Sequence, residues 1–304
     1  MYKGVSYPSS TPKKLYRKVR KTLLVDSRDR NPVNTQSRYS VALPKEYENV
    51  YSVTLRSAEI PISWYTFSSY AGNTSFIASY NGGAETTITI PDGNYTGATL
   101  ATTIQQALLA AFGGSGFAVT YSSTTNKLTF DANQNFLFHF DEHVQTAASC
   151  GTAVPVTPTT SWWGLGYFMG FTRTLHASTS TVLTSDFIVQ LNTENYIIME
   201  LDFINKEDET ALDNRLSGRV DGCFAKIPLT GNTGDIIFFR EWCCPMNKSI
   251  LNPPLGKLKS LSVKFRHHDG RLVQFNNVDH SFTLEFELLD TNFDEYSSLD
   301  FAPL

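Results

Sequence analysis

The sequence has few charged residues and no long hydrophobic run. Charged residues make up 18% of its 304 residues, below the ~25% of an average globular protein, whereas aromatic residues reach 13%. The longest nearly apolar run, 162–171, is far shorter than the ~20 residues of a membrane-spanning helix. A disordered chain is excluded too, because disorder requires low hydrophobicity and high net charge. We therefore expect a folded chain that buries a large aromatic surface.

Cysteine is also scarce. The N-terminus is rich in Pro, Ser and Lys and has no apolar segment, so we expect neither a secretory signal nor a disulfide framework. A tetrahedral zinc site calls for Cys-x-x-Cys spacing, which the adjacent Cys243 and Cys244 do not provide. We expect free and mostly buried thiols at the four cysteines, which are Cys150, Cys223, Cys243 and Cys244.

The net charge of -4 hides an uneven distribution. Residues 1–21 carry seven basic side chains and no acid, and the remainder carries 18 basic and 29 acidic side chains. A basic arm can bind an acidic protein patch, an anionic membrane surface or nucleic acid, or it can be a solvated tail. Nucleic acid is the least favoured of these partners, because the arm has little aromatic character and the rest of the chain is acidic. The candidate interaction residues of the arm are Lys13, Lys14, Arg17, Lys18, Arg20 and Lys21.

From residue 22 onward, short alternating segments separated by turn residues indicate β-strands. In the clearest, 51–60, Tyr51, Val53 and Leu55 share one face and Pro61 closes the strand. Many short strands with irregular connections predict two packed sheets with Greek-key crossings, and a jelly-roll β-sandwich is the leading architecture. The other expected strands are 22–25, 39–43 (stopped by Pro44), 187–191, 196–203, 223–228, 235–240, 257–265 and 280–289.

The segment 86–131 has a different pattern. A strand at 86–90 is followed by an apolar stripe at helical spacing in 99–112, which the paired glycines 113–114 end. A hairpin of 117–121 and 127–130 comes next. We predict a small α+β insertion in an otherwise all-β domain. The stripe consists of Leu100, Ile104, Ala107, Leu108 and Ala111.

Residues 145–186 are poor in charge and rich in Thr, Ser, Gly and Pro, which predicts a long loop. The expected domain organisation is a basic arm at 1–21 and one jelly-roll domain at 22–304, interrupted by the insertion and this loop. The loop holds an aromatic cluster that packs in a core or against a subunit, or alternatively stacks on sugar rings. Its members are Trp162, Trp163, Tyr167, Phe168 and Phe171.

No pattern in the sequence carries a convincing catalytic or metal site. His139-Phe-Asp-Glu142-His143 matches the inverted zincin motif H-x-x-E-H, but that chemistry needs a helix, and the preceding aromatic residues favour a strand with an exposed end. On a strand the two histidines would stand about 13 Å apart, too far for one ion. We expect no metal, no cofactor and no enzymatic activity.

Two further groups have structural explanations. A cupin-like metal triad would use His267, His268 and His280, but neighbouring histidines on a strand face opposite ways, so a strand end before a turn is the better account. The charged segment 26–30 is expected to be a salt-bridged turn in which Arg28 and Arg30 satisfy nearby carboxylates and carbonyls. Nothing singles out a pair of acids for glycoside hydrolysis.

The order of short motifs resembles the minor capsid and penton (vertex) proteins of large icosahedral double-stranded DNA viruses of algae and protists. A basic arm leads into 23–30, and 49–61, 90–95 and 279–285 follow in the same order as in these proteins. The resemblance implies a single jelly roll in the virion capsid, synthesised in the host cytoplasm. It also implies a homo-oligomer, with a pentamer favoured, and contacts with the major capsid protein, other minor capsid proteins and, through the arm, an inner membrane surface.

The sequence thus predicts a structural virion protein that self-assembles through lateral strand faces and aromatic loops. A carbohydrate-binding or host-attachment jelly roll is the alternative, and it requires a concave aromatic patch. A jelly-roll metalloenzyme is the third reading, and it requires a stoichiometric metal. The resemblance carries no catalytic residues over to this chain.

Overall fold

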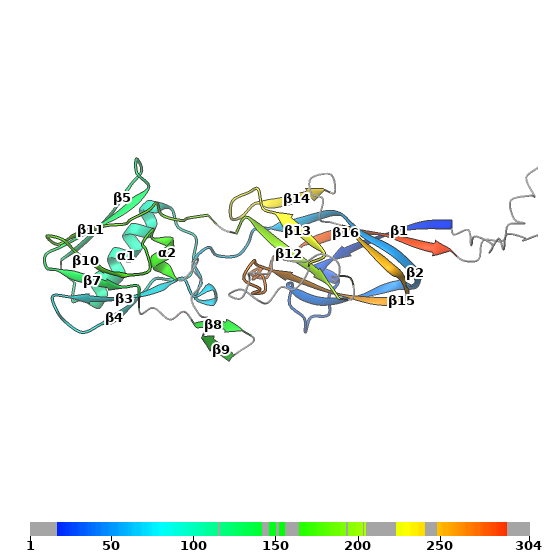
Figure 1. Cartoon of the computed structure of the whole chain (residues 1–304), viewed down its shortest axis with the longest axis horizontal. Helices are drawn as coiled ribbons and strands as arrows, with labels where there is room; N and C mark the ends of the chain where they lie inside the picture. The colour runs from blue at the N-terminus through cyan, green and yellow to red at the C-terminus, as the bar shows by residue number, and fades with distance from the viewer. Residues whose placement is uncertain are drawn as a thin grey trace, which may run out of the picture.

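The computed structural model describes residues 17–114, 116–141, 146–149, 152–155, 164–192, 194–202, 204, 223–240 and 248–290. Its elements form two lobes along the long axis of the molecule (Figure 1). The first lobe contains β1 (Arg17–Asp26), β2 (Arg38–Pro61), β12 (Tyr196–Leu201), β13 (Ala225–Pro228), β14 (Ile236–Arg240), β15 (Lys248–Arg266) and β16 (Ser281–Asp290). The second lobe contains β3 (Ser75–Tyr80), β4 (Thr86–Thr89), α1 (Gly97–Ala111), β5 (Phe117–Ser122), β6 (Lys127–Ala132), β7 (Phe136–His139), α2 (Leu165–Phe168), β10 (Leu175–Ala177) and β11 (Val182–Thr184).

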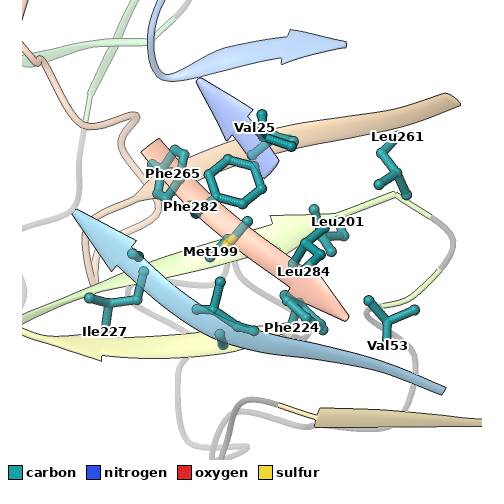
Figure 2. Close-up of a cluster of buried hydrophobic side chains, with 14 of the residues drawn as sticks. Val25, Val53, Met199, Leu201, Phe224, Ile227, Leu261, Phe265, Phe282 and Leu284 are labelled. Atoms are coloured by element: carbon teal, nitrogen blue, oxygen red, sulfur yellow. The ribbon is translucent and has the colours of Figure 1, made fainter. Parts of the chain in front are cut away.

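The first lobe is one antiparallel sheet that curls around its own core. The hydrogen-bonded order is β1-β16-β2-β15-β12-β13, and β14 pairs with β2. The last strand lies between the first two, the kind of crossing expected of a Greek key. Side chains from all seven strands meet in one apolar cluster, part of which Figure 2 shows around Met199, Phe282 and Leu284. The fold is all-β and jelly-roll-like, as expected, but hydrogen bonds join the strands into one curled sheet.

The strand β2 runs through Pro44, so the prediction of a strand end there is wrong. Opposite this segment the register with β15 shifts between Leu258 and Ser260, which face Tyr47 and Ala42. Four residues of β2 therefore face one of β15, and the proline lies in this irregular stretch, where its missing N–H breaks no regular ladder. Pro61 does end the strand, as expected.

The second lobe has its own core, and α1 packs on it. Thr96 caps α1 in a capping box with Thr99, and Leu100, Ile104 and Leu108 are fully buried, as their helical spacing predicts. Ala111 is exposed, because it lies at the end of the helix, where Phe112 is the C-cap. Sheets β10-β7-β3-β4 and β11-β6-β5 supply the remaining core side chains, among them Phe76, Phe130 and Phe138.

The lobe boundaries differ from the expected insertion at 86–131. The second core extends from Phe67 to Val189, so it joins the insertion with the described part of the segment expected as a long loop. That part contains α2, β10 and β11, and β8 (Thr146–Ser149) and β9 (Thr152–Pro155) form a further hairpin. The segment 187–191 is not a strand; Phe187, Val189 and Gln190 instead donate backbone hydrogen bonds to Gly170, Asn126 and Phe168. Among the described residues, no helix is long and apolar enough to cross a membrane.

His280 is buried in the aromatic core of the first lobe. Its Nε2 lies 3.0 Å from the Tyr39 hydroxyl, and its ring lies against Phe265 and Phe275, each with centroids 4.7 Å away. Burial lowers the pKa of His280 to about 4, partly offset by the carboxylate of Asp279. The imidazole is therefore neutral in the folded protein at pH 7 and acts as a core side chain, not as a metal ligand.

Phe138 should be essential to the second core. Its ring contacts Phe76, Phe130 and Phe171, with centroid distances of 4.9 to 6.0 Å. We expect Phe138→Ala to lower the free energy of unfolding by about 3–5 kcal/mol, because it leaves a cavity in a fully buried site. Leu175→Ala, at a half-exposed position on the neighbouring strand, should cost less than about 1 kcal/mol. Urea unfolding followed by circular dichroism measures both, and equal losses would contradict this packing.

Stability should fall as the pH drops from about 6.5 to about 4. In this window the unfolded chain binds a proton at His280, with an ordinary pKa of 6.5, and the folded chain does not. The loss attributable to this side chain is up to about 3 kcal/mol. To measure this loss, unfolding free energies of the wild type and of His280→Phe are compared from pH 7 to pH 4. The wild type should lose more stability than the variant over this range. Tyr39→Phe removes the same hydrogen bond but keeps the imidazole, so it should keep the pH dependence; a parallel profile for His280→Phe would refute the assignment.

Candidate assembly surface

One face of the first lobe points away from the core across β1, β16, β2, β14 and the start of β15. The strand registers align its residues in rows, and we call this surface the outer face. Toward the second lobe the rows are Asp26–Ser281–Glu59–Phe238 and Leu24–Thr283–Ser57–Arg240. Toward the opposite end they are Thr22–Glu285–Thr54–Lys248 and Arg20–Glu287–Ser52–Ile250.

The end of the outer face away from the second lobe is an ionic network built on Glu285 and Glu287. We call it the basic half, because four cations surround these two carboxylates. Glu287 accepts a hydrogen bond of 3.0 Å from the Ser52 hydroxyl, and its carboxylate lies 3.3 Å from Arg20 Nη2. Glu285 lies 2.5 Å from Arg56 Nη2. Lys18 and Lys248 each place Nζ 3.8 Å from Glu287, so among the described residues four cations face two carboxylates here.

This environment keeps Glu287 ionised. Burial alone would raise the pKa of Glu287, but the hydrogen bond from Ser52 and the charges of Lys248, Lys18 and Arg20 outweigh it and lower the pKa. Arg56 is an extra residue in β2 at a shift of register with β16, where Leu55 and Ser57 face Leu284 and Thr283. It follows Thr54 of the outer row by two residues, so it lies on the same face and is the fourth cation of the basic half.

The structure shows the place of four of the six predicted basic arm residues. Arg17, Lys18, Arg20 and Lys21 belong to β1, so the last five residues of the expected arm at 1–21 are part of the sheet. Lys18 also lies over the Tyr51 ring at 4.3 Å, and Lys21 lies over the Tyr47 ring at 4.9 Å. The remaining two, Lys13 and Lys14, lie outside the described residues.

The end of the outer face near the second lobe has apolar margins. Leu24 of β1 is 81% exposed, and Phe238 of β14 is 68% exposed. Ile236 is half exposed beside Phe238, so both border strands carry large apolar side chains toward solvent. Between them lie small and polar residues such as Ser57 and Thr283. Exposed apolar side chains on two edge strands are typical of a surface that contacts other chains.

The predicted aromatic cluster is divided. Phe168 and Phe171 are buried in the second core, where Phe168 packs against Phe67 with ring centroids 5.4 Å apart. Tyr167 is partly buried beside Phe168. Trp162 and Trp163 lie outside the described residues. The described members therefore serve as core side chains, which is one of the roles that the sequence suggested for the cluster.

The turn after β1 is salt-bridged, as predicted. Asp26 accepts hydrogen bonds from the backbone and side chain of Arg28, which lower the pKa of this aspartate to about 2. Arg30 donates hydrogen bonds of 2.6 Å to the Ser27 carbonyl and to the carboxylate of Asp279. These bonds fasten the turn to the segment that leads into β16, so they fix the end of β1 relative to the outer face.

The histidines take structural positions. His139 lies in the strand β7, not in a helix, and it is buried against Ser79 at 3.0 Å, contrary to the exposed position expected for it. His143 lies outside the described residues. His267 is buried and His268 exposed, on opposite faces at the end of β15, before the expected turn. Within the described part of the chain, no three His, Cys, Asp or Glu side chains are grouped to hold a metal ion. Of the cysteines, Cys223 is buried, and the other three lie outside the described residues.

A small cavity of about 40 Å³ lies between the two cores. It is lined by Trp64, Tyr70, Phe168, Glu194, His267 and Arg271, among others. Burial raises the pKa of Glu194 to about 8 and lowers that of His267 to about 3, so at pH 7 both groups are neutral although Glu194 Oε1 lies 3.8 Å from Nδ1 of the imidazole. The cavity admits small molecules of the size of water, not a sugar ring.

Several residues of the outer face were not predicted from the sequence to be surface contacts. Phe238 and Ile236 alternate with the buried Ile237 and Phe239, so the segment 235–240 reads as a strand, but its outer residues cannot be told from core residues by pattern. Lys248 joins the basic half only through the pairing of β15 with β2.

No family model and no curated protein matches the chain. Two solved structures are similar to it over most of its length. One is a mavirus penton protein, at 12% identity and a TM-score of 0.46, which covers 90% of this chain and 99% of the penton chain. The other is a chain of the Sputnik virophage structure determined by cryo-electron microscopy, at 12% identity and a TM-score of 0.40, covering 88% and 97%.

Proposed function

We propose that the protein is a structural component of a virion, a penton or minor capsid protein that self-assembles. The observation that carries the proposal is the pair of apolar edge strands that border the outer face. Leu24 on β1 and Phe238 on β14 project to solvent from opposite margins of the same face. The resemblance of the motifs at 23–30, 49–61 and 279–285 to capsid proteins supplies the biological context.

The geometry of these two edges favours a ring. Contacts between unlike edges of successive copies are heterologous, and such contacts close into a ring when the rotation between copies allows it. The β1 margin of one copy would pack against the β14 margin of the next, which buries Leu24 and Phe238 together. A pentamer is the ring that fits an icosahedral vertex.

The partners follow from the same role. Neighbouring capsomers, including the major capsid protein and other minor capsid proteins, would contact the remaining faces. β1 begins at the end of the first lobe far from the second lobe, next to the basic half. The lysines that precede β1 in the sequence would pair with acidic protein surfaces or an inner membrane surface. Nucleic acid is not the expected partner, and the place of action is the capsid.

The apolar margins should control the oligomeric state. We expect the purified protein to form discrete pentamers by native mass spectrometry, and Ile236→Ser combined with Phe238→Ser to shift it to monomers. The control Phe187→Ser removes an equally exposed side chain from the second lobe (61% exposed) and should leave the pentamer intact. Two results would contradict the role of the apolar margins. One is a monomeric wild type, and the other is a pentamer that survives the β14 substitutions but dissociates in the control.

The basic arm should contribute to assembly without contributing to folding. Deleting residues 1–16 keeps β1 whole, so we expect an unchanged unfolding midpoint and a reduced yield of assembled particles when capsid components are co-expressed. Replacing Lys3, Lys13 and Lys14 with Gln in the full chain separates charge from length and should reproduce most of the loss. Normal assembly of both variants would remove the arm from the mechanism.

A further inference from the structure

In the described part of the chain, the basic half of the outer face brings four cations together with two carboxylates. Lys18, Arg20, Arg56 and Lys248 surround Glu285 and Glu287, and Lys18 and Arg20 keep more than half of their side-chain surface in solvent. Such a surface attracts an acidic ligand. The described part of the chain offers no further acid within ion-pair distance of these two exposed cations.

The chain holds an acidic segment at the right place. β16 ends at Asp290, which lies opposite Arg17, one residue before Lys18. The segment 291–304 follows directly and contains three acids and no Lys, Arg or His. Its acidic side chains are Asp294, Glu295 and Asp300, interspersed with Phe293, Tyr296 and Phe301.

We propose that the acidic segment 291–304 docks on the basic half of the outer face of its own chain. From Asp290 to Glu295 the backbone spans up to about 17 Å, whereas Lys18 and Arg20 are separated by about 7 Å along β1. Asp294 and Glu295 therefore reach both cations after one reversal of the chain. The aromatic side chains of the segment would pack along the aliphatic stems of the lysines and arginines.

The same chain is favoured over a second copy as the source of the segment. A short tether gives the segment a local concentration in the millimolar range, well above that of a neighbouring molecule in dilute solution. The docked segment neutralises the basic half in the free protein, so an acidic partner must displace it. This inference does not depend on the proposed virion role, because it concerns one chain in solution.

A zero-length carbodiimide cross-linking experiment on the full chain tests the docking. Light and ¹⁵N-labelled protein are unfolded and refolded together, so that any oligomer contains both, and cross-linked peptides are identified by mass spectrometry. Links from Lys18 and Lys248 to Glu287 serve as the internal reference, since both Nζ atoms lie 3.8 Å from that carboxylate. Lys259, which is 77% exposed on β15 near Glu46, is the control lysine.

We expect links from Lys18 or Lys248 to Asp294 or Glu295 within light–light and heavy–heavy pairs only. Arg20→Gln combined with Arg56→Gln leaves every cross-linking group in place and should lower the yield of these links about threefold or more. Arg38→Gln, on the distant end of β2, should leave the yield unchanged.

Three results would overturn the proposal. Mixed light–heavy links would assign the segment to a neighbouring copy. Links from the segment to Lys13 or Lys14 in place of Lys18 and Lys248 would assign it to the N-terminal arm. Reference links to Glu287 without any link to the segment, or equal yields in the Arg20/Arg56 and Arg38 variants, would show that the charge of this face does not hold it. None of these results bears on the pentamer, which is measured separately.

Discussion

The pairing of β2 on both of its edges is the constraint on which the first lobe depends. β16 occupies one edge, and β15 and β14 share the other. Within the described sheet, β1 is attached through β16, and β12 and β13 are attached through β15. The core-facing side chains of β2, among them Val53, Leu55 and Ile60, are fully buried. A strand of this length has no stability of its own, so its partners and the core beneath it hold it in place.

The irregular points of β2 show how one strand serves several neighbours. At the bulge between Leu55 and Ser57, the extra residue Arg56 contacts Glu285 on the outer face while Leu55 stays in the core. The stretch around Pro44 likewise absorbs a residue that cannot donate to the ladder. Register shifts therefore interrupt the pairing of β2 with both β15 and β16.

Local sequence patterns were sufficient where local physics decides the structure. The spacing of Leu100, Ile104 and Leu108 predicted α1, and the charges of 26–30 predicted the turn. The patterns failed where a distant partner decides. Arg17–Lys21 were predicted to be part of a basic arm because β16, which pairs with these residues, lies at the other end of the sequence. The outer face could not be foreseen for the same reason, since its rows combine residues from five strands whose register no single segment encodes.

The placement of the chain's strands gives the molecule two unlike poles. β1 begins and β16 ends side by side at one pole, and the second lobe, a continuous excursion from β2 to β12, forms the other (Figure 1). Because the sheet closes without the second lobe, sequence can change or grow there while the strand pairing beneath it is left untouched. An insertion in a loop of the second lobe would therefore lengthen that pole of the molecule without shifting the register of β1 and β16 at the other.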